Sequence, residues 1–329
     1  MATAQQLKAL LESYAHGDRG RFLSVASQIA AHAARAGKDR LAADLRKLVD
    51  QAKRAADQPS PPTRPVPIAQ PTGELAGLVS ATFPRITLSD MVLDDGLALR
   101  LKRVLREYRQ ADALAGHGLA PRRKLLLLGP PGSGKSMTAA ALAGELHLPL
   151  LTVQFHTLIT KFMGETAAKL RLIFDNMKQS RGVYLFDEFD AIGSHRHIGQ
   201  DVGEIRRVLN SFLVFLEQDD STSLVIAATN LEASLDSALF RRFDDVLRYE
   251  IPAKPMARRL IKNRLAPFQI GRLGWRRIEE ACEGLCHADI TKACEDAAKE
   301  AILDDRPTIR TEGLLGALRQ RHRTARTQT

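Results

Sequence analysis

Cysteine and aromatic residues are scarce in this sequence. The three cysteines are Cys282, Cys286 and Cys294, an odd number within one short segment, which excludes a disulfide framework. Cys282 and Cys286 can share one helix face near His287, so a metal site and a simple role as small core residues both stay open. Aromatic residues make up only 5% of the chain, and we therefore expect a mainly aliphatic core.

Long apolar runs are absent as well. The N-terminus does not follow the basic-then-apolar pattern of an export signal, and no apolar run is as long as a membrane span. We therefore expect a cytoplasmic protein without a membrane span. The 329 residues, 44% apolar and 26% charged, are enough for two or three globular domains.

Acidic residues are outnumbered by basic ones, 38 to 48, which gives a formal charge of +10. The surplus lies at the two ends: residues 1–58 contain ten basic and six acidic residues, and residues 306–329 contain six and one. A basic balance fits an anionic partner such as nucleic acid, a lipid surface or an acidic protein, but it also fits a simple contribution to solubility.

The chain divides into stretches of different pattern. Residues 1–57 contain apolar stripes at helical spacing, which predict a small helical bundle, and residues 58–82 contain six prolines, which predict an extended linker. In residues 83–252 buried strands alternate with helices, so we expect an α/β fold with a parallel sheet between helical layers. Residues 253–322 show only helical patterns and predict a separate α-helical domain, followed by a basic tail at 323–329.

The apolar pattern also gives approximate bounds. We expect one helix at Asp95–Leu114, another beginning at Lys135, and no strand after Pro252. The expected strands are Lys124–Leu128, Leu148–Gln154, Val183–Phe186, Ser223–Ala228 and Val246–Ile251.

The strongest signal is a glycine-rich turn between an apolar strand and a helix. Its sequence is Gly129-Pro130-Pro131-Gly132-Ser133-Gly134-Lys135-Ser136, a full match to the phosphate-binding pattern G-x-x-x-x-G-K-S. Glycines let the backbone approach a phosphate closely, and successive amides at a helix N-terminus attract the anion. We expect Lys135 to reach the β- and γ-phosphates of ATP, Ser136 to ligate Mg²⁺, and Met137 to lie beside the nucleotide.

Two adjacent carboxylates follow a later buried strand. Asp187 is expected to hold Mg²⁺, through water because this cation loses its hydration reluctantly. Glu188 is expected to act as the general base that polarises the attacking water. Asp190 has a simpler interpretation as the cap of the following turn. An acidic pair alone is weak evidence, but at this spacing after a phosphate-binding turn it is strong.

The next buried strand ends in Thr229 and Asn230. The carboxyl ends of parallel strands face the ligand crevice, so Asn230 can orient the water or contact the γ-phosphate; a turn asparagine is the simpler interpretation. Further on, Arg241 and Arg242 are either a solvated pair or fingers inserted into a neighbouring subunit's nucleotide.

The segments GPPGSGKS, LFDEFDAIG, IAATN and LDSALFRRFD, in this order and spacing, resemble the AAA family of ATPases over about residues 83–303. The resemblance implies an αβα nucleotide domain with a helical lid, bound ATP and Mg²⁺, and a hexameric ring with sites between subunits. It also implies that Asn230 is the sensor-1 residue and that Arg241 and Arg242 act in trans. Asp90 and Val92 belong to a segment that resembles the stretch whose backbone reads adenine.

A further segment, Lys161-Phe162-Met163 with the following Gly164, resembles the pore loop of protein-remodelling members of this family. Phe162 would then project into an axial channel and grip an extended polypeptide through non-directional apolar contact. The simpler interpretation is a core phenylalanine at a helix start. We favour the pore interpretation because Gly164 and Glu165 precede an amphipathic run.

Two segments depart from the family pattern. Cys286-His287-Ala288-Asp289 stands where family members often carry Ser-Gly-Ala-Asp, so a histidine replaces a glycine near the nucleotide. Leu216–Asp220 stands where an acidic-glycine-aromatic segment is common, so signalling between subunits is expected to differ.

These observations favour a Mg-ATP-dependent ring motor that remodels or unfolds protein substrates through a central pore. The N-terminal bundle would bind the substrate or an adaptor, and a separate protease is a plausible partner. The alternative is a DNA-associated ATPase, such as a loader or a transposition accessory, which the basic ends of the chain favour.

Overall fold

The computed structural model describes residues 77–154, 165–189, 202–230, 237–304 and 308–327, together with the single residues 25, 29, 75 and 158. The chain forms two compact units, Met1–Val66 and Pro67–Thr329, and the description below concerns the second unit. Apart from residues 25 and 29, the predicted bundle at 1–57 lies outside the described residues, as does most of the predicted linker at 58–82.

The second unit contains a six-stranded sheet with the order β1-β3-β4-β5-β2-β6. Five strands run parallel, and the edge strand β1 runs antiparallel to β3. The strands are β1 (Ser80–Thr82), β2 (Lys124–Leu128), β3 (Leu150–Gln154), β4 (Val183–Asp187), β5 (Leu224–Thr229) and β6 (Asp245–Arg248). β1 lies inside the stretch expected to be a linker, so the folded domain begins earlier than the proline content indicates.

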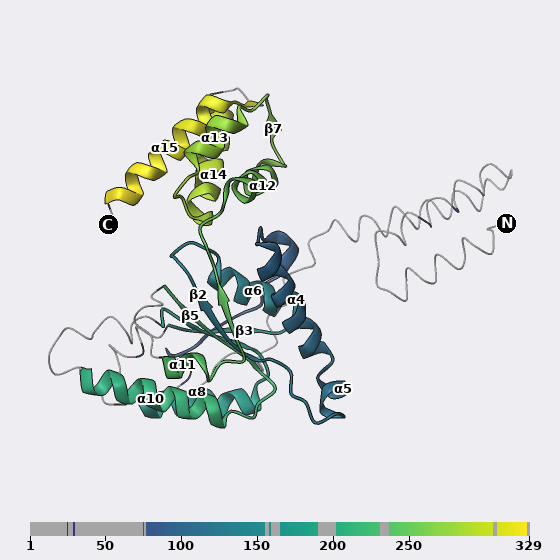
Figure 1. Ribbon diagram of the computed structural model, residues 1–329, viewed down its shortest axis with the longest axis vertical. Helices are drawn as coiled ribbons and strands as arrows, with labels where there is room; N and C mark the ends of the chain where they lie inside the picture. The colour runs from purple at the N-terminus through teal and green to yellow at the C-terminus, as the bar shows by residue number, and fades with distance from the viewer. Residues whose placement is uncertain are drawn as a thin grey trace. The chain divides into compact units, whose positions relative to one another are not determined.

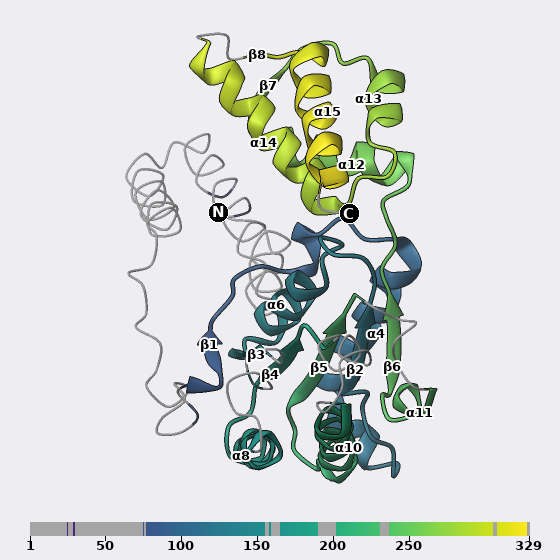
Figure 2. The same ribbon diagram turned by 90° about the vertical axis from the view of Figure 1, so that its left-hand side faces the viewer.

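Helices cover both faces of this sheet (Figure 2). The larger ones are α4 (Asp95–Arg109), α6 (Lys135–Leu146), α8 (Thr166–Gln179) and α10 (Val202–Gln218); α5 (Ala111–Ala115), α11 (Ser237–Phe240) and the 3₁₀ turn η3 (Leu88–Asp90) are short. Burial on both faces explains the run of four leucines in β2, because successive strand residues point to opposite sides. The expected αβα sandwich is therefore confirmed, although the single helix expected at Asp95–Leu114 is broken at Gln110.

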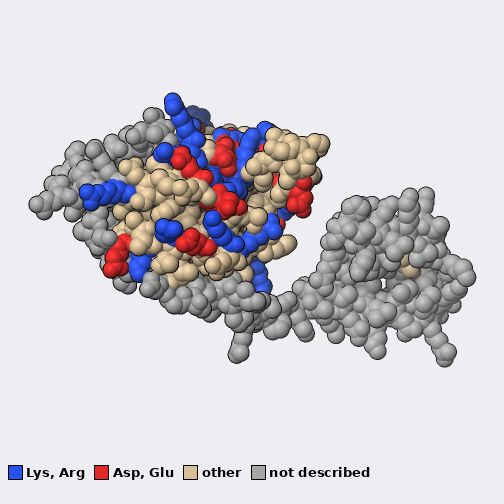
Figure 3. Space-filling model, turned by 90° about the horizontal axis from the view of Figure 1, so that it is seen from below, with Lys and Arg blue, Asp and Glu red and all other residues tan. Residues whose placement is uncertain are grey.

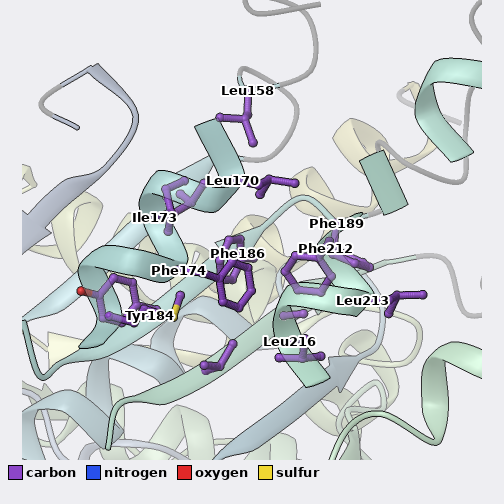
Figure 4. Close-up of a cluster of buried hydrophobic side chains, with 14 of the residues drawn as sticks. Leu158, Leu170, Ile173, Phe174, Tyr184, Phe186, Phe189, Phe212, Leu213 and Leu216 are labelled. Atoms are coloured by element: carbon purple, nitrogen blue, oxygen red, sulfur yellow. The ribbon is translucent and has the colours of Figure 1, made fainter. Parts of the chain in front are cut away.

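The two faces of the sheet are packed with different residues. The face under α4 and α6 is aliphatic apart from Tyr108 and Tyr249. The face under α8 and α10 contains a cluster of phenylalanines (Figure 4), whose rings lie at centroid distances of 4.9–5.9 Å. Its members are Phe174, Phe186, Phe189, Phe212 and Phe215. The expectation of an aliphatic core is thus wrong for one face, because the few aromatic residues are concentrated there.

The C-terminal residues form a smaller helical domain with its own core (Figure 1). Its helices are α12 (Lys254–Leu265), α13 (Trp275–Ala281), α14 (His287–Leu303) and α15 (Thr311–Thr327). Two short strands, β7 (Gln269–Ile270) and β8 (Thr308–Ile309), pair in parallel, so the expectation of no strand after Pro252 is wrong. Helix α15 also continues to Thr327 and takes up most of the expected tail.

All three cysteines lie in this small helical domain. Cys282 and Cys294 are buried in its core, and burial raises the pKa of each thiol to about 12. Both side chains pack among the apolar residues of this core, which favours the simple core interpretation for these two cysteines. No cluster of three or more metal-ligating side chains occurs among the described residues. Within the same residues, no helix is long and apolar enough to cross a membrane.

Candidate active site

The glycine-rich turn lies between the end of β2 and the start of α6. Gly129, Gly132 and Gly134 have φ angles of 153°, 70° and 103°, which side chains with a Cβ rarely adopt. A Cβ on Gly129 would lie 2.5 Å from the Tyr249 carbonyl oxygen, and a Cβ on Gly132 would lie 2.6 Å from the Cys286 Sγ. Glycine is therefore required at 129 and 132 for both conformation and space, and at 134 for conformation.

Lys135 lies at the start of α6 and is only 7% exposed. Its Nζ donates hydrogen bonds to the carbonyl oxygens of Gly129 (2.8 Å) and Pro130 (3.0 Å) and to Asn230 Oδ1 (2.7 Å). Asn230 directly follows β5, so the ends of two neighbouring strands meet at this ammonium group. The contact joins two residues that lie 95 positions apart in the chain.

A second junction joins α6 to the end of β4. Ser136 Oγ donates to Asp187 Oδ2 at 2.7 Å, and Asp187 Oδ1 accepts the backbone N–H of Glu188 at 2.9 Å. A hydroxyl beside a carboxylate is a set of hard oxygen donors, which suits Mg²⁺. The residues present therefore fit the metal that the sequence predicts, with the carboxylate held by the Glu188 backbone N–H and the hydroxyl held by the carboxylate.

Glu188 lies at the border of the site with an unusual backbone. Its φ of 55° is left-handed, a region that non-glycine residues seldom occupy. The side chain is exposed and lines a cavity of about 710 Å³ together with the glycine-rich turn and Asp187. A carboxylate that remains accessible inside a nucleotide-sized cavity can take a proton from a bound water.

The segment expected to read adenine borders the same cavity. Asp90 and Val92 both line it, as does Met137, which is 40% exposed. The Asp90 carboxylate caps η3 by accepting from the N–H and the hydroxyl of Thr87, and the first of these bonds does most to lower the pKa of Asp90. The side chain of Asp90 is therefore committed to the fold, which leaves the backbone of this segment to contact a ligand.

The small domain closes the cavity from the other side. The Ala288 N–H donates to the Gly132 carbonyl at 3.0 Å, and Cys286 Sγ donates to Asp289 at 2.9 Å. His287 lines the cavity, and burial lowers its pKa. This segment is thus bonded to the phosphate-binding turn through Ala288, with Cys286 Sγ beside Gly132. Among the described residues, the buried Nδ1 of His287 has no hydrogen-bond partner.

The two arginines lie elsewhere. Arg241 and Arg242 form a turn after α11; Arg241 is exposed, and Arg242 pairs with Glu217 at the end of α10. Neither residue lines the nucleotide cavity of its own chain. The expected pore loop, Lys161, Phe162 and Met163, lies outside the described residues, as does Asp190.

Two supporting interactions were not expected from the sequence. Tyr249, buried after β6, donates to Thr138 Oγ1 at 2.7 Å and so holds α6 from below the glycine-rich turn. Asp219 is buried and pairs with Arg123, with its carbonyl also bonded to the same guanidinium. The segment that departs from the family pattern therefore fastens the end of α10 to the start of β2. Neither contact has a local sequence signal, since each joins residues about a hundred positions apart.

A phosphate-binding turn after one parallel strand, with paired carboxylates at the carboxyl end of another, defines a P-loop nucleotide-binding domain. The model of the ATPase family associated with various cellular activities (AAA) matches residues 125–251. An uncharacterised AAA family ATPase of Sinorhizobium fredii is 34% identical over 326 residues, which cover 98% of this chain and 96% of that protein. This chain therefore belongs to the AAA family and is an ATP-hydrolysing enzyme.

Other relatives match a smaller share of the chain. A proteasome-activating nucleotidase of Methanoculleus marisnigri is 32% identical over 61% of this chain and 51% of its own length. An ATP-dependent zinc metalloprotease FtsH of Helicobacter felis is 27% identical over 75% of this chain and 40% of its own length. The crystal structure of the FIGL-1 AAA domain has a TM-score of 0.60 at 26% identity, covering 74% of this chain and 85% of that one. The chain thus spans about half or less of the length of the nucleotidase and of the FtsH protease.

Proposed function

We propose that this chain is a Mg-ATP-dependent ring motor, most simply a hexamer, that remodels or unfolds protein substrates through a central pore. One observation carries the proposal: the cavity contains every expected hydrolytic group except the arginines. Arg241 and Arg242 do not line it, so a second copy of the chain is needed to supply them. An enzyme with shared sites of this kind works as an oligomer.

Each group at the cavity then has a role in hydrolysis. Residues Gly129–Met137 hold the phosphates, with Lys135 against the β- and γ-phosphates. Asp90 and Val92 flank the adenine ring. Ser136 and Asp187 would hold Mg²⁺, which neutralises phosphate charge when bound. Glu188 accepts a proton from the attacking water, Asn230 orients that water, and the neighbour's arginine stabilises the charge of the transition state.

The action on protein substrates rests on the relatives and on the pore segment. Two relatives are, by name, a proteasome-activating nucleotidase and an ATP-dependent zinc metalloprotease. In this chain Phe162 would grip the polypeptide, and the N-terminal bundle would select it. This action would take place in the cytoplasm, with a separate protease as a partner. If Phe162→Ala keeps ATP turnover but loses unfolding of a tagged fluorescent protein, the pore assignment stands; unchanged unfolding contradicts it.

The shared site has a sharper test by subunit mixing. Glu188→Gln and the double variant Arg241→Ala/Arg242→Ala should each lose most turnover alone. When the two are mixed, an intact Glu188 can sit beside intact neighbouring arginines, so turnover should reappear. Inactive mixtures that still assemble would contradict arginines acting in trans, and full activity of the arginine variant alone would do the same.

The structure supports the DNA-associated alternative less than it supports the ring motor. On the face of the described residues seen in Figure 3, Lys and Arg lie among Asp and Glu rather than in one continuous patch. Ion pairs among the described residues include Lys178–Asp220 and Arg171–Asp175. If the alternative were right, the full chain would bind duplex DNA with an affinity that falls steeply with salt.

A further inference from the structure

Strand β4 would not by itself present Glu188 to the nucleotide. Along β4, Tyr184 and Phe186 point into the phenylalanine cluster, while Val183 and Leu185 point into the aliphatic face. Continued alternation would direct residue 188 to the same side as Phe186, into the apolar core. The carboxylate instead lines the nucleotide cavity, so the alternation is broken at this residue.

The alternation is broken because Phe189, and not Glu188, occupies the next position in the apolar core. Phe189 is fully buried in the phenylalanine cluster, its ring 4.9 Å from that of Phe212 (Figure 4). Its N–H donates to the Ala228 carbonyl on β5 at 2.9 Å. Residues 186 and 189 therefore occupy the same face, and the left-handed φ of Glu188 is the turn that makes this possible.

We infer that Phe189 is the positioning residue for Glu188: its buried ring and its backbone bond hold Glu188 in a left-handed conformation that points the carboxylate at the nucleotide. Left-handed backbone is unfavourable for glutamate and persists only where neighbours enforce it. On the other side of Glu188, its own N–H is fixed by Asp187. The bond to Ala228 also ties the base to β5, two residues before Asn230.

The inference rests on the proposed role of Glu188 as general base. It predicts that loosening Phe189 lets Glu188 relax toward an ordinary conformation, so the water is no longer polarised. Binding depends on the glycine-rich turn and on Lys135 at the start of α6, the helix that packs on the other face of the sheet. Turnover should therefore fall while ATP affinity stays unchanged, a separation that general unfolding would not produce.

The test uses the full chain with Phe189→Leu, Phe189→Ala and the control Phe174→Leu. Phe174 lies in the same cluster on α8 and touches Phe212, so its loss should lower the melting temperature comparably. We expect kcat to fall about tenfold or more in Phe189→Ala and less in Phe189→Leu, since a positioned base contributes about 10²–10⁴-fold. KM and the affinity for a fluorescent ATP analogue should stay within about twofold in both, and Phe174→Leu should keep kcat.

Equal kcat in Phe189→Leu and Phe174→Leu would overturn the inference, and so would an affinity for ATP that falls in step with kcat. If Phe189→Ala does not fold, Phe189→Leu decides, because it keeps an apolar side chain in the cluster. Glu188→Gln separates the two levels of the argument. If Glu188→Gln turns over ATP normally, the assignment of the base is wrong; if it is inactive while Phe189→Leu is fully active, only the positioning role is wrong.

Discussion

The two faces of the central sheet support different parts of the same reaction. On the aliphatic face, α6 carries the phosphate-binding turn, and Tyr249 and Met91 pack beneath it. On the opposite face, the phenylalanine cluster holds the residue that follows Glu188. Binding of nucleotide and its hydrolysis therefore depend on separate packed layers, and substitutions on one face should affect one step more than the other.

The largest expected effect is on the binding face. Lys135→Ala removes a buried ammonium group that contacts both the turn and Asn230. We expect ATP affinity to fall by at least about tenfold and turnover to be lost, because a charge-assisted contact to phosphate contributes about 1.5–3 kcal/mol. Isothermal titration with ATP checks this, with the exposed Lys102→Ala as control. Unchanged affinity would contradict phosphate binding at this turn.

On the hydrolysis face, Glu188→Gln should separate the two steps. Glutamine keeps the shape of the side chain but cannot take the proton, so kcat should fall by about 10²–10⁴-fold. ATP affinity should be kept or increased, since a negative charge near the phosphates is removed. Single-turnover kinetics with labelled ATP measures both quantities. A parallel loss of affinity would show that Glu188 acts in binding instead.

A matched pair of tyrosines compares the faces with smaller changes. Tyr249 donates to Thr138 below the phosphate-binding turn, and Tyr184 donates to the Ser180 carbonyl on the phenylalanine face. Tyr249→Phe removes one hydroxyl bond worth about 1 kcal/mol, which corresponds to about 2–4 °C in melting temperature. Tyr184→Phe removes two, because the Tyr184 hydroxyl also accepts from Asn176 Nδ2 at 2.8 Å, so its melting temperature should fall further. Only Tyr249→Phe should raise the KM for ATP. A similar rise in Tyr184→Phe would mean that the faces are not independent.

The sequence predicts the chemical groups of this site better than the contacts that hold them in place. Residues 129–136, 187, 188 and 230 follow local patterns at strand ends, and a parallel sheet brings such ends together. By contrast, Tyr249–Thr138 and Arg123–Asp219 join distant residues without any local pattern. The alternation along β4 even directs Glu188 to the wrong face, because the burial of Phe189 decides the backbone there. Strands of two residues, such as β7 and β8, are too short for periodicity to show.

The smallest expected effect concerns His287, where the small domain meets the phosphate-binding turn. Burial lowers its pKa, so the folded protein binds this proton less readily than the unfolded chain, whose histidine titrates near 6.5. Stability from this group is therefore present above about pH 6.5 and is lost as the pH falls below it toward the lowered pKa. His287 lines the nucleotide cavity and a second cavity beside it. The charged residues of the first are Asp90, Lys135, Asp187, Glu188, Arg264, Lys292 and Glu295, and those of the second are Asp94, Arg100, Arg248 and Glu250.

We expect the melting temperature to fall between pH 7.5 and pH 5.5 and to fall less in His287→Gln, which keeps a polar side chain but does not titrate. His322, which contacts the Ala281 carbonyl in the same helical domain, provides the control substitution His322→Gln. Because Ala288 beside His287 bonds to Gly132, the same acid shift should also weaken ATP binding in the wild-type chain more than in His287→Gln. Identical pH profiles of wild type and His287→Gln would show that protonation of other groups controls the contact between the small domain and the phosphate-binding turn.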